Sequence, residues 1–325
     1  TGMITASDAD GDSLIFSVVS SVGTYGSLGI DGTSGLWTYT LNNSDTDTDS
    51  LYQGESVTDT ITVTVSDGKG GSTTEDVVVT ITGSNDDPVI TSAPADADSA
   101  TTTAAEGAIT EDASQTTATG TITASDIDGD SLTFSVASPV GTYGTLAIDA
   151  ASAGAWTYTL NNSDPDTDSL SQGESVTDRI TVTVSDGKGG STTEDVVVTI
   201  TGSNDGPTIT SAPADSNSGT TTAAEGSVTE DASQTTATGT ITASDADTGD
   251  SLTFSVEGSN GTYGTLAIDA ASAGAWTYTL NNSDPDTDSL SQGESVTDTI
   301  TVTVSDGKGG STTENVVVTI TGSND

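Results

Sequence analysis

The stretch GTYGTLAIDAASAGAWTYTLNNSDPDTDSLSQGESVTD occurs at residues 141–178 and again, unchanged, at 261–298. A close variant runs from Gly23 to Asp59, so the chain carries three copies of one unit. A spacing of 119 and then 120 residues separates the matching tryptophans Trp37, Trp156 and Trp276. Self-similarity at a fixed period is the mark of a tandem array in which each period forms one structural unit.

Two prolines suggest where one unit ends and the next begins. Pro88 and Pro207 each follow a tract that contains Gly-Ser-Asn-Asp. We therefore expect three units, at residues 1–87, 88–206 and 207–325. The first copy begins at the counterpart of Thr119, so its leading segment is absent and we expect the sequence to be a window from a longer array.

The pattern within one unit predicts β-strands. Alternating or β-branched segments lie at residues 119–124, 132–136, 180–184 and 196–201, and such residues favour strands. Trp156, Tyr158 and Leu160 alternate with threonines and should share one buried face. Turn signals recur about every ten residues, and no segment has a helical period. We therefore predict an all-β fold of tandem immunoglobulin-like antiparallel β-sandwiches in a linear array.

The composition excludes several classes of function. The chain has 49 acidic and 4 basic residues, neither His nor Cys, and a net charge of -45. Histidine acid–base chemistry, cysteine nucleophiles, structural zinc and disulfides are therefore absent. Such acidity disfavours nucleic acid and anionic membranes as partners and favours cations. No apolar run approaches the ~20 residues of a membrane span. Every acidic pair recurs in other copies, so we do not expect an enzyme.

The acidic residues gather in turns rather than scatter. ASDADGDSL (6–14), ASDIDGDSL (124–132) and ASDADTGDSL (243–252) each alternate Asp with small residues around a glycine. Acids spaced by two allow several oxygens to converge on one hard cation, but Asp and Gly are also ordinary turn residues. The EF-hand spacing is not met. On this pattern alone, a metal loop and a solvated turn both remain open.

Longer motifs carry a family resemblance. TEDASQTTATGTITASDIDGDSLTFSV (110–136) and VSDGKGGSTTEDVVVTITGSND (184–205) resemble the VCBS repeat of large bacterial surface proteins and RTX-type adhesins. They are also similar to cadherin repeats in their early Glu, their DxD, a late Asp and an NDxP linker. The resemblance covers all three copies and implies a cadherin-like sandwich, calcium (Ca2+) between consecutive units, and an extracellular location at the bacterial cell surface.

The resemblance also implies ligands for each ion site. For the first junction it implies Glu55, Asn85, Asp86, Asp126, Asp128 and Asp186. For the second junction it implies Glu111, Glu174, Asn204, Asp205, Asp245, Asp247 and Asp306. Half-sites at the chain ends would use Asp8, Asp10 and Asp67, and Glu230, Glu294, Asn324 and Asp325. The sequence departs from cadherins because QGES replaces the usual DRE and the linker lacks a second Asn.

The function implied is that of a calcium-stiffened extender of an extracellular adhesin in cell adhesion and biofilm, structural rather than catalytic. Its partners would be calcium ions and neighbouring repeats, with no membrane insertion. Two alternatives remain. The first is a filament subunit completed by strand exchange with other copies of the same chain, because the first copy lacks its leading segment. The second is a glycan-binding module that uses an exposed aromatic such as Tyr52.

Overall fold

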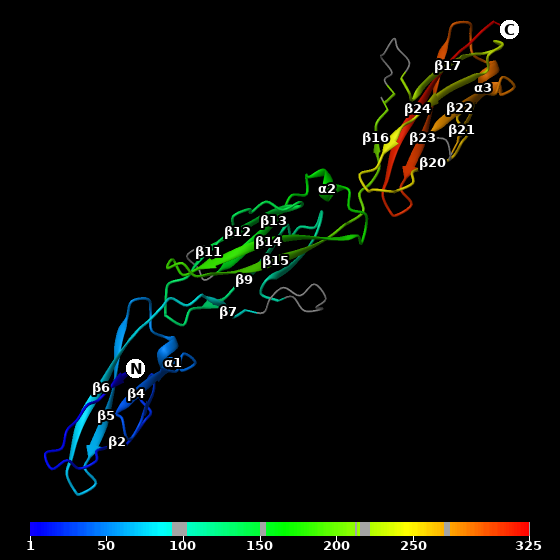
Figure 1. The fold of residues 1–325 in the computed structure, drawn as a ribbon. Coiled ribbons are helices and arrows are strands. Elements are labelled where there is room, and N and C mark those ends of the chain that lie inside the picture. Colours follow the sequence, from blue (N-terminus) through cyan, green and yellow to red (C-terminus); the bar gives the residue numbers. More distant parts are fainter. Residues whose placement is uncertain (93–102, 150–153, 212, 215–221, 270–273, 325) are drawn as a thin grey trace.

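The computed structural model describes residues 1–92, 103–149, 154–211, 213–214, 222–269 and 274–324. Figure 1 shows three β-rich units that follow one another from the N-terminal to the C-terminal end of the chain. We call them units 1, 2 and 3. The fold predicted from the strand pattern, an all-β array of sandwiches, is the fold observed.

Unit 1 is built from two three-stranded sheets, β1-β4-β3 and β2-β5-β6, both antiparallel. Its elements are β1 (Gly2–Met3), β2 (Ile15–Val18), β3 (Gly26–Ile30), β4 (Leu36–Leu41), α1 (Thr46–Asp49), β5 (Ser56–Ser66) and β6 (Ser72–Thr82).

Unit 2 has a four-stranded sheet, β11-β14-β15-β8, a three-stranded sheet, β12-β13-β9, and the short pair β10-β7. Its elements are β7 (Val89–Ile90), β8 (Glu106–Thr110), β9 (Thr117–Thr121), β10 (Ala124–Ser125), β11 (Thr133–Ser135), β12 (Gly144–Ile148), β13 (Ala155–Leu160), α2 (Pro165–Asp168), β14 (Ser175–Ser185) and β15 (Ser191–Thr201).

Unit 3 repeats this arrangement with sheets β17-β24-β23-β20, β18-β22-β21 and β16-β19. Its elements are β16 (Thr208–Ile209), β17 (Glu225–Thr229), β18 (Thr236–Thr240), β19 (Ala243–Ser244), β20 (Thr253–Val256), β21 (Gly264–Ile268), β22 (Ala275–Leu280), α3 (Pro285–Asp288), β23 (Ser295–Ser305) and β24 (Ser311–Thr321).

The long hairpin of each unit follows from simple alternation. In unit 2, β14 and β15 pair in register from Ser175–Thr201 to Ser185–Ser191. Ile180, Val182 and Val184 are buried on the inner face, because side chains two residues apart point to the same side of a strand. The hairpin therefore presents its closing turn, residues 186–190, at one end of the unit.

One pairing in units 2 and 3 is parallel and was not anticipated. β8 runs beside β15 in register from Glu106–Val197 to Thr110–Thr201, and β17 pairs with β24 in the same way. The tract 93–107 has no alternating period in its sequence, which predicts a loop or an irregular edge. Residues 93–102 lie outside the described residues, but Glu106 and Gly107 begin β8. Since β8 and β15 lie far apart in sequence, no hairpin turn constrains their direction.

The core of unit 2 lies between its two larger sheets. Trp156, Tyr158 and Leu160 share the buried face, as predicted, at 2%, 0% and 5% exposure. The indole N–H of Trp156 donates to the Ala104 carbonyl at 2.9 Å. A Cβ at Gly120 would lie 2.5 Å from the Trp156 ring, so only glycine allows the strand to approach so closely. Truncating a buried tryptophan typically costs about 3–5 kcal/mol.

The tract NNSDPDTDS folds into a one-turn helix, although the sequence showed no helical period. In α2, the Asp164 side chain accepts a hydrogen bond from the Asp166 backbone N–H at 3.1 Å, and Pro165 occupies the first turn. These are standard features of a helix start. The helix places Asp168 at its C-terminal end, facing the linker to the next unit.

A second set of acids has a structural role inside each unit. Asp178 is 4% exposed and accepts hydrogen bonds from the backbone of Thr142 and Tyr143 and from the Tyr158 hydroxyl. Asp59 and Asp298 occupy the same position in units 1 and 3. Donors surround these carboxylates, so they are satisfied within their own unit and are not metal-ligand candidates.

Candidate metal centres at the junctions

The acidic loop of unit 2 lies at the first junction, which we define as the linker 84–88 with the loops 124–132 and 186–190. Asp126 accepts from the backbone N–H groups of Asp128 and Asp130 at 3.0 and 3.4 Å. Carboxylate oxygens of the three aspartates lie within 4.8 Å of one another. Gly129 takes a left-handed conformation, with φ of 76°, which allows the loop to turn inward.

The linker from unit 1 is tied directly to this loop. The Asn85 side-chain amide donates to Asp186 at 2.7 Å and to the Asp86 carbonyl at 3.0 Å. The Asp86 backbone N–H donates to an Asp128 carboxylate oxygen at 2.8 Å. The Asn85 amide, helped by N–H groups of the 186–190 turn, holds the pKa of Asp186 below its usual range. These contacts bring five predicted ligands of the first junction together.

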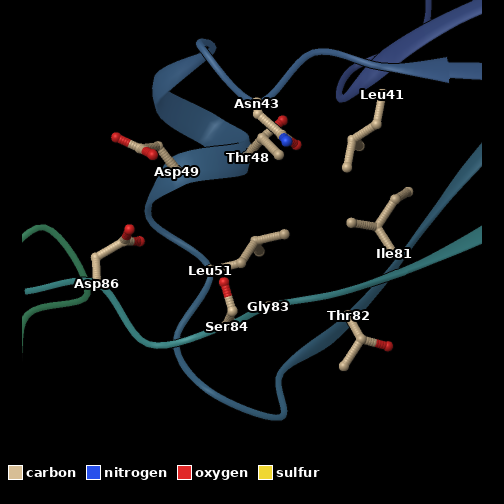
Figure 2. A pocket seen from close by; sticks show the side chains of 10 residues that line it. All are labelled: Leu41, Asn43, Thr48, Asp49, Leu51, Ile81, Thr82, Gly83, Ser84 and Asp86. Atoms are coloured by element: carbon tan, nitrogen blue, oxygen red, sulfur yellow. The ribbon is translucent and has the colours of Figure 1, made fainter. Parts of the chain in front are cut away.

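Unit 1 adds a carboxylate that the sequence analysis did not select. Asp49, at the end of α1, and Asp86 line the same pocket of about 190 Å³. Figure 2 shows the two carboxylates beside one another at the edge of this pocket, outside the Leu51 side chain. Burial raises the pKa of Asp86, and the negative charges of Asp128 and Asp49 raise it further. Carboxylates from both units, Asp49 of unit 1 and Asp128 of unit 2, therefore repel the carboxylate of Asp86.

The second junction repeats these contacts between units 2 and 3. We define it as the linker 203–207 with Glu111, α2 and the loops 243–252 and 306–310. The Asn204 amide donates to Asp306 at 2.9 Å, and the Asp205 N–H donates to Asp247 at 2.9 Å. Glu111 accepts from the Ser203 N–H at 2.8 Å.

The electrostatics of the second junction are those of crowded, buried acids. Burial raises the pKa of Glu111 to about 7, and Asp205 and Asp112 add repulsion. Burial likewise raises the pKa of Asp205 to about 6, with Asp112 and Asp168 contributing. Both groups therefore hold a proton far more readily than an ordinary carboxyl. Asp168 and Asp112 belong to this junction, although neither was selected from the sequence.

A third carboxylate completes the loop of unit 3. Oxygens of Asp245, Asp250 and Asp306 lie within 4.8 Å of one another. The Lys308 ammonium contacts Asp250 at 2.5 Å. Lys188 pairs with Asp130 in unit 2 at 3.2 Å in the same way. The sequence analysis predicted neither Asp250 nor Asp130 as a ligand, although both stand in the quoted loops.

The donor atoms at the junctions fit a calcium ion. They are carboxylate and amide oxygens without nitrogen or sulfur ligands, the set that calcium prefers. Asp247 is 3% exposed, and its Oδ1 has no hydrogen-bond partner among the residues that the structure describes. Five more buried oxygens at the two junctions also lack a hydrogen-bond partner within the described parts of the chain: Asn85 Oδ1, Asp126 Oδ2, Asp128 Oδ1, Asn204 Oδ1 and Asp245 Oδ2. Buried acceptors without donors are costly unless a cation lies against them.

The predicted half-sites at the chain ends show the same local geometry. In unit 1, Asp8 accepts from the Asp10 N–H at 2.9 Å, and Asp67 closes its turn through Lys69 N–H at 2.7 Å. In unit 3, Glu230 is 2% exposed and accepts from the Ser323 N–H at 3.0 Å. Asn324 has an interaction partner, and Asp325 lies outside the described residues.

The glutamates of the QGES tracts are placed differently from the other predicted ligands. Glu174 and Glu294 are exposed and accept hydrogen bonds from the backbone N–H groups of Ser171 and Ser291, in their own turns. Glu55 occupies the matching turn of unit 1. The charge of Asp128 and then that of Asp49 act on Asp86, and the charge of Asp112 and then that of Asp168 act on Asp205. The structure therefore does not bring these glutamates into the acidic clusters, and their role as ligands stays a prediction.

Comparison with known proteins agrees with this architecture. The bacterial cadherin-like domain family matches residues 1–83, 85–202 and 211–322. A search of curated protein sequences gives no match. No helix in the described parts of the chain is long and apolar enough to cross a bilayer.

Solved structures with the same fold are themselves arrays of cadherin domains. Extracellular cadherin domains 1–5 of protocadherin gamma B2 match 96% of the chain, with a TM-score of 0.57 and 14% identity. Domains EC22–24 of mouse cadherin-23 match 98% of it, with a TM-score of 0.51 and 16% identity. The chain spans 53% of the first structure and 89% of the second. At these identities the likeness concerns the fold.

Proposed function

Because the chain belongs to the bacterial cadherin-like domain family, whose modules have structural, adhesion-type roles outside the cell, we propose that it is an extender segment of a bacterial surface adhesin, stiffened by calcium. Its units would hold an adhesive tip away from the cell. The proposal includes the unit limits 1–87, 88–206 and 207–325, with the ions held where one unit meets the next.

The observation that carries the proposal is the set of buried, unpartnered oxygens contributed by both sides of each junction. At the second junction, Asn204 comes from the linker and Asp247 from unit 3, and each keeps one such oxygen. A single unit could not assemble this set. An ion bound there would therefore hold the two units in one relative orientation.

The chain's own residues would do two things at each junction. Asp126, Asp128 and Asp186 at the first junction, and Asp245, Asp247 and Asp306 at the second, would hold the ion from the C-terminal unit. The linker asparagine, hydrogen-bonded across the junction, positions the linker carboxylate over that cluster. Calcium supplies the positive charge that offsets the repulsion among these carboxylates. Extracellular modules of this kind bind it at ~10⁻⁴–10⁻³ M.

The test is small-angle scattering on residues 1–325 in millimolar calcium and then in chelator. We expect a rod that becomes shorter on average and more variable when calcium is removed. Asp245→Asn with Asp247→Asn should produce part of that change even in calcium. Glu257→Gln with Glu314→Gln is the matched control, since it removes two acidic charges from unit 3 outside the junction. A scattering profile that ignores calcium would contradict the proposal.

The filament alternative requires that chains exchange an edge strand. In unit 2, β8 forms one edge of the four-stranded sheet and covers Val197 of β15, which is 6% exposed. A strand of the β8 type from another copy could pair with β15 in its place. Sedimentation at increasing protein concentration tests this, because strand exchange raises the apparent mass and a non-exchanging chain keeps a constant one.

The glycan-binding alternative gains less support from the structure. Trp156 and Tyr158 are buried in the core and are not available to stack on a sugar ring. Tyr52 is 50% exposed. Loss of sugar binding on Tyr52→Ala would favour this alternative over an extender.

A further inference from the structure

Each unit contains a lysine that reaches the acidic loop at its N-terminal end. The chain has only four basic residues in total. Three of them make the same ion pair: Lys69 with Asp12 at 3.5 Å, Lys188 with Asp130 at 3.2 Å and Lys308 with Asp250 at 2.5 Å. Almost all the positive charge of a very acidic chain is therefore placed at the candidate ion sites.

The turn that carries this lysine is held by a candidate calcium ligand, which in unit 3 is Asp306. Asp306 accepts hydrogen bonds from the backbone N–H groups of Lys308, Gly309 and Gly310 at 2.7, 3.0 and 3.1 Å. Gly307 and Gly309 have φ values of 78° and 126°, which the tight turn requires. The carboxylate that holds the turn thus also fixes where the lysine side chain begins. Lys308 is therefore linked to the acidic cluster twice, by its backbone N–H to Asp306 and by its ammonium to Asp250.

The contact becomes closer and more buried along the chain. The side chains of Lys69 and Asp12 are 71% and 35% exposed, those of Lys188 and Asp130 are 46% and 14%, and those of Lys308 and Asp250 are 41% and 1%. Exposed ion pairs contribute little because solvent screens them, whereas a buried carboxylate is screened far less. The pairs therefore form a graded series, with the strongest at the second junction.

We propose that Lys308, and more weakly Lys188, acts as a tethered cation that competes with calcium at its junction. This inference rests on the proposed calcium sites. The ammonium lies against one member of the cluster formed by Asp245, Asp250 and Asp306. Without calcium it offsets part of the repulsion there. With calcium, the same positive charge opposes the ion, so the lysine sets the affinity of the junction.

The sequence offers a matched set of variants. Lys308→Gln removes the charge at the second junction, Lys188→Gln at the first, and Lys69→Gln at the exposed end. Arg179→Gln is the control, since Arg179 carries the remaining positive charge and pairs with Asp195 on the exposed side of the long hairpin of unit 2. Lys308→Arg keeps the charge and serves as the conservative variant.

The experiment measures calcium binding to residues 1–325 by isothermal titration calorimetry and, separately, the melting temperature in chelator. At the dielectric of water, a unit positive charge about 6 Å from a divalent ion changes the affinity for that ion by roughly tenfold. We expect Lys308→Gln to tighten binding at one site by about that factor and to lower the melting temperature in chelator. Lys188→Gln should have a smaller effect, and Lys69→Gln and Arg179→Gln little effect.

The outcomes separate this inference from the function on which it rests. If the unmodified chain binds no calcium, the proposed function fails and the inference fails with it. If the chain binds calcium but Lys308→Gln binds equally or more weakly, only the tethered-cation inference is overturned. Equal effects of Lys308→Gln and Arg179→Gln would also overturn it, because net charge alone would then explain the change. Tighter binding by Lys308→Gln with unchanged binding by Lys308→Arg supports it.

Discussion

The two junctions share one set of contacts and differ in another. In both, the linker asparagine donates to the aspartate of the hairpin turn, Asn85 to Asp186 and Asn204 to Asp306. They differ in the acidic loop, which at the second junction is one residue longer, ASDADTGDSL (243–252) against ASDIDGDSL (124–132). The common contacts come from what the copies have in common. The additional contacts come from residues that only one junction has, so two junctions of one array need not respond equally to calcium.

The inserted residue of the third copy is one such difference. Thr248 extends the acidic loop of unit 3 and reaches back to unit 2. Its N–H donates to the Ser169 carbonyl at 3.2 Å, and its carbonyl accepts from the Ser171 hydroxyl at 3.0 Å. These contacts need no ion. The second junction therefore has a direct connection between units in addition to its acidic cluster.

The largest expected effect is the response of the two junctions to chelation. The chain has no cysteine, so spin labels can be placed at Ser56, Ser175 and Ser295, exposed equivalents at the start of β5, β14 and β23. We expect the Ser56–Ser175 distance distribution to broaden more than the Ser175–Ser295 distribution when calcium is removed. Calcium at a hundredfold excess over the dissociation constant of a site stabilises the ion-bound arrangement of that junction by about 2.7 kcal/mol. Equal broadening at both junctions would show that the Thr248 contacts carry no weight.

An effect of intermediate size should appear in the pH dependence of the second junction. The pKa of Glu111 rises from an ordinary 4.5 to about 7 on folding, so the folded chain holds a proton that the unfolded chain releases. In chelator, the stabilisation of the folded chain by this proton is fully present below about pH 4.5 and is lost as the pH rises through about 7. We expect unfolding free energy to fall by about 1–3 kcal/mol over that range.

Chemical denaturation at pH 5 and pH 7.5 measures this change. Glu111→Gln is the informative variant, because its side-chain oxygen can still accept from the Ser203 N–H while it no longer titrates. The variant should show a shallower dependence on pH than the unmodified chain. Identical slopes for both proteins would assign the dependence to other acids.

The smallest effect should come from removing Thr248. Its deletion gives the loop the length found at the first junction and removes two hydrogen bonds, each contributing about 1 kcal/mol. In chelator, the Ser175–Ser295 distances should then broaden toward those of the first junction. Thr248→Ala is the control, since both contacts use backbone atoms of Thr248. Broadening in Thr248→Ala would mean that the side chain, not the longer loop, makes the difference.

Local pattern predicted much of this architecture. Alternation placed Trp156 and Tyr158 in the core, because the two-residue period of a strand is itself a local property. The parallel pairing of β8 with β15 was not predictable in this way. Glu106 meets Val197 only after the chain has folded around the whole unit, and nothing in a five-residue strand specifies so distant a partner.

The same limit explains what was missed at the junctions. Asp168 and Glu174 lie six residues apart on one connection, and either could have faced the linker. The choice depends on the turn of α2, which directs Asp168 toward Asp205 and leaves Glu174 bonded to its own loop. The buried aspartates posed the opposite problem. Asp178 looks like any other acid in the sequence, but its hydrogen bonds to Tyr143 and Tyr158 make it part of the core.

The parallel pairing of β8 and β15 also has a mechanical consequence. The two strands lie near opposite ends of unit 2 in sequence but side by side in the sheet, so tension along the array pulls them in opposite directions along their length. Once the two-residue strand β7 has been pulled away, the register from Glu106–Val197 to Thr110–Thr201 is loaded in shear. Its hydrogen bonds must then break together rather than one after another, so this pairing would act as a clamp against extension.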